Sequence, residues 1–148
     1  LGGAMGNTTK IYELTCASAF EHVEEFAGLV QGAASDLQLP EEEEVDLMIA
    51  VMEAVNNAIL HGNQEDVQKN IRMKIEADPS SMTVWVHDEG GGFVVNAVPD
   101  PLAPANVMNT SGRGILMMQA FMDDVEILPT DTGTVVKLTK TFSTKSSV

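Results

Sequence analysis

Cysteine is almost absent from this chain of 148 residues. The single Cys16 excludes an internal disulfide and a metal site built from several clustered cysteines. Since nothing in the sequence calls for an oxidising compartment, we expect a cytoplasmic protein.

Basic residues are scarce as well. Eight Lys and Arg stand against 22 Asp and Glu, which gives a formal net charge of −14. A charge of this sign opposes binding to nucleic-acid phosphates and to anionic lipid headgroups. The sequence also lacks an apolar run long enough to cross a bilayer. We therefore expect no nucleic-acid partner and no membrane association, and a protein partner with a basic surface fits the charge better.

The length suits one domain, and hydrophobic residues make up 44% of the chain, which is enough for a core. We expect this domain to span residues 7–142. The glycine-rich residues 1–6 look like the remnant of a purification tag. Residues 143–148 are expected to form a flexible tail.

The hydrophobic pattern predicts eight elements. Residues 10–15 alternate as a strand, residues 18–37 have helical spacing behind Ser18 as N-cap, and residues 41–61 form a second helix ended by Gly62. Strands over 67–77 and 82–87, a helix over about 113–122, and a strand pair split at 131–133 follow. The order β, α, α, β, β, α, β, β predicts an α+β two-layer sandwich, with helices covering one face of a mostly antiparallel sheet.

The second helix should have a core stripe and a separate polar stripe. At about 100° per residue, the core stripe comprises Val45, Met48, Met52, Val55 and Ile59. The polar stripe comprises Glu53, Asn57 and His61, and the small side chains of Ala50 and Ala54 beside it should let a ligand approach the backbone.

The polar stripe has the chemistry of a phosphate and magnesium site. An Asn57 oxygen suits one position around Mg²⁺, and the Glu53 carboxylate one turn earlier can activate a hydroxyl or a water. His61 is open to two interpretations, because a histidine at a helix end can cap carbonyls or contact phosphate.

A glycine cluster at residues 90–92 follows the strand that ends at Asp88. It could be only a flexible strand end, but glycines also let a backbone approach a ligand closely. A buried Asp88 carboxylate needs a donor, which the exocyclic amine of adenine supplies and the carbonyl of guanine does not. Asp88 therefore predicts selection of ATP over GTP.

A second glycine loop comprises Gly112, Arg113 and Gly114 and opens a helix. Backbone amides at such a helix start can bind a triphosphate, although a lone Gly-x-Gly is weak evidence. The long loop ahead of it, residues 99–110, is a candidate lid over the nucleotide.

Taken together, these segments resemble the ATPase domain shared by gyrase, histidine kinases and the MutL repair proteins. The resemblance rests on residues 53–62, Asp88 with Gly90 and Gly92, residues 112–115, and Gly133 with Thr134. Within that superfamily, the short length, the Glu-Ala-x-x-Asn-Ala-x-x-His motif and residues 118–127 look like the anti-sigma factor serine/threonine kinases of bacterial partner-switching pathways. The resemblance covers nearly all of residues 7–142 and implies a Bergerat-type ATP-binding fold.

The resemblance also implies roles for individual residues. Glu53 would be the general base, Asn57 the magnesium ligand and Asp88 the adenine reader. Gly90, Gly92, Gly112 and Gly114 would form the nucleotide loops, and Thr134 would line the adenine end. We expect His61 and Arg113 as further nucleotide contacts.

By the same resemblance, the protein would phosphorylate a serine or threonine on a small STAS-fold antagonist, bind a sigma factor, and form a homodimer. An ATP-gated binding switch without kinase activity remains the alternative, because alignment of the acceptor hydroxyl depends on a partner. A sensor histidine kinase fits less well, since all three histidines lie inside the predicted domain.

Overall fold

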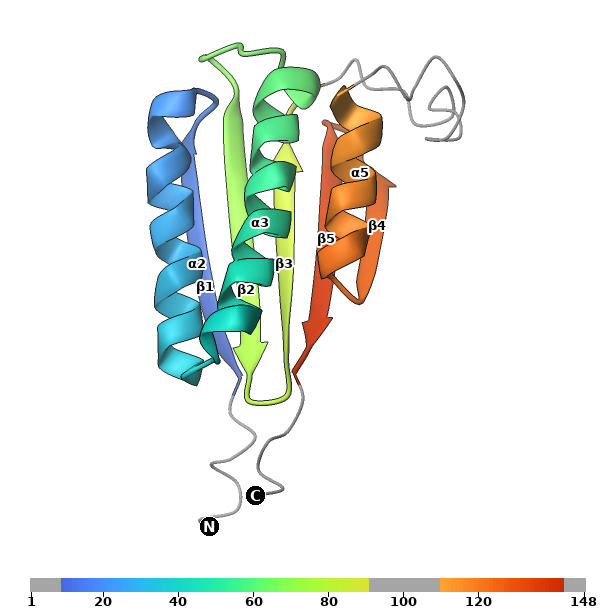
Figure 1. Ribbon diagram of the computed structural model, residues 1–148. Coiled ribbons are helices and arrows are strands. Elements are labelled where there is room, and N and C mark those ends of the chain that lie inside the picture. Colours follow the sequence, from blue (N-terminus) through green and yellow to red (C-terminus); the bar gives the residue numbers. More distant parts are fainter. Residues whose placement is uncertain (1–8, 91–109, 143–148) are drawn as a thin grey trace, which may run out of the picture.

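The computed structural model describes residues 9–90 and 110–142, with the side chains of residues 110–113 excepted (Figure 1). The predicted order of helices and strands is confirmed. The elements are β1 (Lys10–Ala17), the 3₁₀ turn η1 (Phe20–His22), α2 (Val23–Leu37), α3 (Glu41–Asn57), the π-helical turn η2 (Ala58–Gly62), β2 (Asn70–Asp78), β3 (Ser81–Asp88), α5 (Thr110–Phe121), β4 (Asp124–Pro129) and β5 (Thr134–Thr141).

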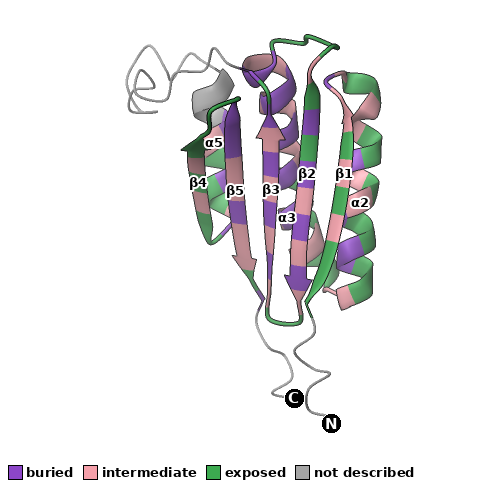
Figure 2. Ribbon diagram, turned by 180° about the vertical axis from the view of Figure 1, so that it is seen from behind, coloured by how far each residue is buried: buried purple, intermediate pink, exposed green. Residues whose placement is uncertain are grey.

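The strands form one sheet in the order β1-β2-β3-β5-β4, and every neighbouring pair is antiparallel. Helices α2, α3 and α5 lie on one face of the sheet, and the other face is open (Figures 1 and 2). This confirms the predicted α+β sandwich. Figure 1 shows α3 between the other two helices, and its C-terminal end lies at the same end of the sheet as the C-terminal end of β3.

Alternation along the strands explains why only one face is covered. In β2 and β3 every second residue is buried toward the helices, while the intervening residues are partly or fully exposed on the open face (Figure 2). The fully buried centre joins the two layers through Phe26 of α2, Leu47 of α3, and Ile75 and Val84 of the sheet. On the open face, Trp85 is flanked by the ammonium groups of Lys74 and Lys137, which lie 5.3 and 5.9 Å from its ring centroid.

The predicted cap at Ser18 is wrong. Strand β1 continues to Ala17, which pairs with Asn70, and the backbone N–H of Ser18 then donates to the carbonyl of Lys69 at 2.9 Å. Because the sheet takes up these residues, the helical segment begins only at η1, and no side chain of the described residues caps η1 or α2.

The predicted core stripe of α3 is displaced. Val45 is 48% exposed, whereas Ala50 and Ala54 are completely buried in the core and do not form the floor of a ligand site. Helix α3 contacts α2 on one side and α5 on the other, so its buried surface is wider than one stripe and small residues allow close packing. The buried residues of α3 are Leu47, Ala50, Val51, Ala54 and Val55.

In the described ranges, no helix combines the length and the apolar character that a membrane span requires.

Candidate functional site

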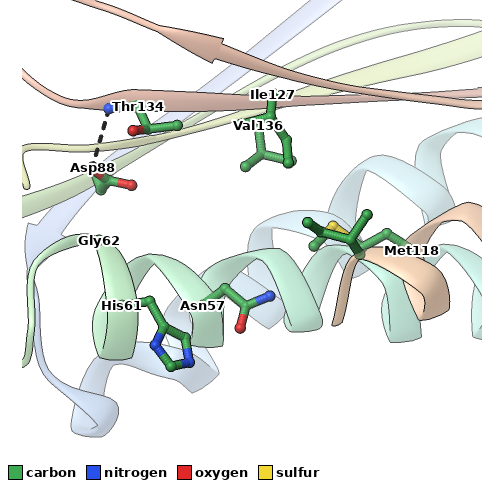
Figure 3. A pocket seen from close by; sticks show the side chains of 9 residues that line it. Asn57, His61, Gly62, Asp88, Met118, Ile127, Thr134 and Val136 are labelled. Carbon is green, nitrogen blue, oxygen red and sulfur yellow. Dashed lines mark hydrogen bonds between the residues drawn. The ribbon is translucent and has the colours of Figure 1, made fainter. Parts of the chain in front are cut away.

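A pocket lies between the C-terminal end of α3, the helix α5 and the ends of β3, β4 and β5 (Figure 3). Its walls are formed by Asn57, His61, Gly62, Asp88, Ile115, Met118, Ile127, Thr134 and Val136.

The helical wall ends in a widened turn. The N–H of Asn63 donates to the carbonyl of Ala58 at 2.8 Å, which is the five-residue spacing of a π-helix. Such turns are rare in proteins overall, and those that occur often lie at functional sites. The turn brings His61 and Gly62 to the pocket at the end of the helix.

Asn63 fixes this turn to the sheet. Its side chain is fully buried, donates through Nδ2 to the carbonyl of Asn70 at 3.1 Å, and accepts at Oδ1 from the N–H of Glu89 at 2.8 Å. One amide therefore joins the end of α3 to the start of β2 and to the end of β3, and holds Gly62 beside Asp88.

Asp88 is only 8% exposed at the end of β3. Its Oδ1 accepts from the backbone N–H groups of Gly90 at 2.9 Å and Thr134 at 3.2 Å, the second of which is the dashed line in Figure 3. Burial raises the pKa of Asp88, and these two hydrogen bonds oppose the rise because they favour the ionised form. A Cβ at Gly62 would collide with the Asp88 carboxyl, so glycine is required there.

Three buried polar atoms of the pocket residues lack a hydrogen-bond partner among the described residues: Asn57 Oδ1, His61 Nε2 and Thr134 Oγ1. Leaving a buried polar group unpaired costs about 1–3 kcal/mol. Three such groups on residues that line one pocket indicate that it is built to receive a polar ligand.

Glu53 lies one helical turn before Asn57 on α3 and faces α5 across Gly114. A Cβ at Gly114 would lie 3.1 Å from Glu53 Oε2 and would collide with Asn57 Nδ2. The missing side chain thus lets the first half of α5 pack directly on the two polar residues of α3.

The structure brings together seven of the predicted site residues, namely Glu53, Asn57, His61, Asp88, Gly90, Gly114 and Thr134. Gly90 packs against the carbonyl of Gly62 and leaves no space there for a Cβ. Gly112 and Arg113 fall in the first turns of α5. Gly92 and residues 99–109 of the predicted lid lie outside the described residues.

Residues 16–140 match the family model of the histidine kinase-like ATPase domain. This match covers most of the chain. The chain belongs to the histidine kinase-like ATPase family. Within this family, the chain is similar to the anti-sigma F factors of Bacillus thuringiensis (strain Al Hakam) and Bacillus mycoides (strain KBAB4), with 30% identity to each. Each alignment spans 135 residues, 88% of this chain and 92% of the relative.

Two solved structures share the fold of this ATPase domain. The RsbU and RsbW domains of a Mycobacterium tuberculosis protein superpose with a TM-score of 0.65 at 17% identity, over 88% of this chain and 32% of that one. A blue-light activated histidine kinase of Erythrobacter litoralis superposes with a TM-score of 0.57 at 18% identity, over 74% and 34%.

The apolar part of the pocket in this ATPase domain is not evident from the sequence alone. Ile127 and Val136 face each other across the β4–β5 pairing, and Met118 of α5 is 1% exposed opposite them. Strand alternation could have placed Ile127 and Val136 on the helix-facing side, but only the packing of α5 turns that side into a pocket wall. Gly62 was recognised as a helix end and not as a contact of Asp88.

Proposed function

We propose that this domain binds ATP with Mg²⁺ and transfers phosphate to a serine or threonine of a small STAS-fold antagonist, and that it holds a sigma factor in the absence of an available antagonist. The observation that carries the proposal is that buried Asp88 lines the same pocket as three residues whose buried polar atoms have no hydrogen-bond partner among the described residues. Membership of the histidine kinase-like ATPase family supports the use of ATP.

The sheet side of the pocket fits adenine. Asp88 presents a carboxylate at the edge of an apolar enclosure that includes Ile127 and Val136, and it would accept from the exocyclic amine of adenine. Guanine would place a carbonyl against this acceptor, so ATP should be preferred over GTP. Thr134, whose Oγ1 has no partner among the described residues, lies beside Asp88 and would give the base a second polar contact.

The helix side fits the phosphates. Asn57 Oδ1 is a buried, neutral oxygen without a partner among the described residues, which suits a magnesium ligand. His61 Nε2 would donate to a phosphate oxygen, and Gly112, Arg113 and Gly114 at the start of α5 would supply backbone amides. Bound Mg²⁺ would neutralise negative charge that develops on the phosphates.

Glu53 would act as the general base. Its carboxylate would accept the proton of the acceptor hydroxyl as the hydroxyl oxygen forms its bond to the γ-phosphorus and the bond to ADP breaks. Its position one turn before Asn57 supports this role, and Gly114 keeps the space next to its Oε2 free of a side chain.

The proposed protein partners follow from the relatives and from the charge. The relatives are named anti-sigma F factors, and a net charge of −14 favours a partner that presents basic residues. A cytoplasmic location and a homodimer complete the proposal.

Calorimetric titration with ATP and GTP, each with and without Mg²⁺, tests the pocket. We expect Mg²⁺-dependent binding of ATP, weaker binding of GTP by about tenfold or more, and loss of Mg²⁺-dependent binding in Asn57→Ala. Asn56→Ala is the matched control, because Asn56 is adjacent in sequence but is absent from the pocket lining. Equal ATP affinity in wild type and Asn57→Ala would refute the site.

Incubation with radiolabelled ATP and the STAS-fold proteins of the same genome tests transfer. Glu53→Gln should retain ATP affinity and lose labelling of the antagonist by about 100-fold or more. If the wild type binds ATP and a partner but labels no antagonist, the alternative of an ATP-gated switch without kinase activity gains support.

A further inference from the structure

A second group of chemically distinctive side chains lies outside the nucleotide pocket, where β1 leads into α2. Cys16 Sγ is 3.1 Å from Glu25 Oε1, and His22 Nδ1 is 3.2 Å from Glu25 Oε2. A donor atom from each of the three residues lies within 4.8 Å of the other two.

The delayed start of α2 creates this group. The 3₁₀ turn η1 ends at His22, and His22 and Glu25 are three residues apart, so both side chains fall on the same side at the start of the helix. Cys16 reaches them from the helix-facing side of β1, where it pairs with buried Ile71. Three elements thus each supply one donor.

We propose that Cys16, His22 and Glu25 form a zinc site, in which the thiolate, the imidazole Nδ1 and a carboxylate oxygen bind Zn²⁺ and a water completes a tetrahedron. Zinc prefers this combination of sulfur, nitrogen and oxygen, whereas Mg²⁺ and Ca²⁺ prefer oxygen ligands alone. Zinc bonds of about 2.0–2.3 Å place neighbouring donors about 3.3–3.8 Å apart, which small side-chain rotations reach from the observed separations.

The surroundings support His22 as a ligand. Glu21 Oε2 lies 3.5 Å from His22 Nε2, on the side of the ring opposite Glu25. A carboxylate beside the second ring nitrogen can accept its proton, which favours the tautomer that leaves Nδ1 available to a metal, and this arrangement is common around zinc-bound histidine.

Zinc binding would replace the proton of the Cys16 thiol, Cys–SH + Zn²⁺ giving Cys–S–Zn⁺ + H⁺.

Cobalt titration of the full chain, followed by zinc competition with a chromophoric chelator, tests the site. Co²⁺ should give a thiolate-to-metal absorption band in the wild type, which exposed carboxylates cannot produce. Cys16→Ser should abolish the band, and Cys16→Ser, His22→Gln and Glu25→Gln should each weaken Zn²⁺ binding by about 100-fold or more. Glu21→Gln should weaken it by about 10- to 100-fold.

Glu24→Gln is the matched control, because Glu24 is an exposed neighbour of Glu25 outside the group, and its zinc affinity should stay within about twofold of wild type. All variants should retain wild-type circular dichroism and ATP affinity, which separates this site from the nucleotide pocket. A wild type without a thiolate band would overturn the proposal. Unchanged zinc affinity in Cys16→Ser would also overturn it and would assign the bound metal to the acidic surface.

Discussion

Asp88 shows the conflict between stability and ligand selection at the level of one residue. Its carboxyl group is buried against Gly62, and its two backbone donors compensate burial only in part, since its pKa remains raised. A raised carboxyl pKa means that the folded state disfavours the ionised form. The free energy of unfolding should therefore fall as the pH rises from the ordinary carboxyl pKa through the raised value, and stay lower at neutral pH.

Asp88→Asn should consequently raise the melting temperature at pH 7 while weakening ATP binding by about tenfold or more. The Asn side-chain oxygen can still accept hydrogen bonds from the N–H groups of Gly90 and Thr134. Its NH₂ group then faces the amine of adenine, so that two donors oppose each other. Each kcal/mol gained should appear as about 2–4 °C for a chain of this size. Scanning calorimetry at several pH values measures the first effect and titration calorimetry the second.

The difference in melting temperature between Asp88→Asn and wild type should shrink on acidification, because the wild-type carboxyl group then becomes protonated. Asp131→Asn, at an exposed position of the β4–β5 turn, serves as control and should change neither quantity. An Asp88→Asn variant that is less stable than wild type at pH 7 would show that ionised Asp88 stabilises the fold.

At this scale, the sequence identified residues whose chemistry is unusual and failed where packing decides. Asn57 and Asp88 could be singled out because Asn57 shares a helix stripe with Glu53, Asp88 precedes a glycine cluster, and the two motifs together fit a nucleotide site. Ser18 and Val45 were misassigned because their surroundings depend on how far β1 extends and on which helices flank α3. A hydrophobic pattern along the sequence shows neither where β1 ends nor which helices lie beside α3.

At the scale of the element, the π-helical turn η2 and the Asn63 side chain position the pocket together. The turn ends α3 with a wider spacing, and Asn63 connects it to β2 and β3. The sequence predicted a helix that stops at Gly62, and periodicity could not predict the change of hydrogen-bond spacing inside its last turn. The strands, by contrast, were predicted well because alternation survives tertiary packing.

Asn63→Ala should lower the free energy of unfolding by about 1–3 kcal/mol, because the N–H of Glu89 and the carbonyl of Asn70 lose their buried partner. ATP affinity should fall as well, since Gly62 is then no longer held beside Asp88. Urea denaturation and titration calorimetry measure the two effects.

Gln68→Ala, an exposed change in the same α3–β2 connection, is the control and should leave both quantities near wild type. If Asn63→Ala lost stability but bound ATP normally, the contact would hold the fold together without shaping the pocket.

At the scale of the whole molecule, charge should govern self-association. Each protomer carries a net charge of −14, so two copies repel one another until salt screens them. The proposed homodimer should therefore strengthen as ionic strength rises.

Light scattering coupled to gel filtration should give a mass near twice the 15.8 kDa of the chain at about 0.3 M NaCl, and a lower mean mass on dilution at about 0.01 M. A mass of one chain at every salt concentration would exclude the dimer.

The position of Trp85 makes the protein its own optical reporter. It is the only tryptophan, and it lies on the open face of the sheet between Lys74 and Lys137, whereas Asp88 of the same strand is buried toward the helices. Its emission should change when another macromolecule covers the open face and stay nearly constant when nucleotide fills the pocket. Fluorescence can thus distinguish the two events in a single sample without an attached dye.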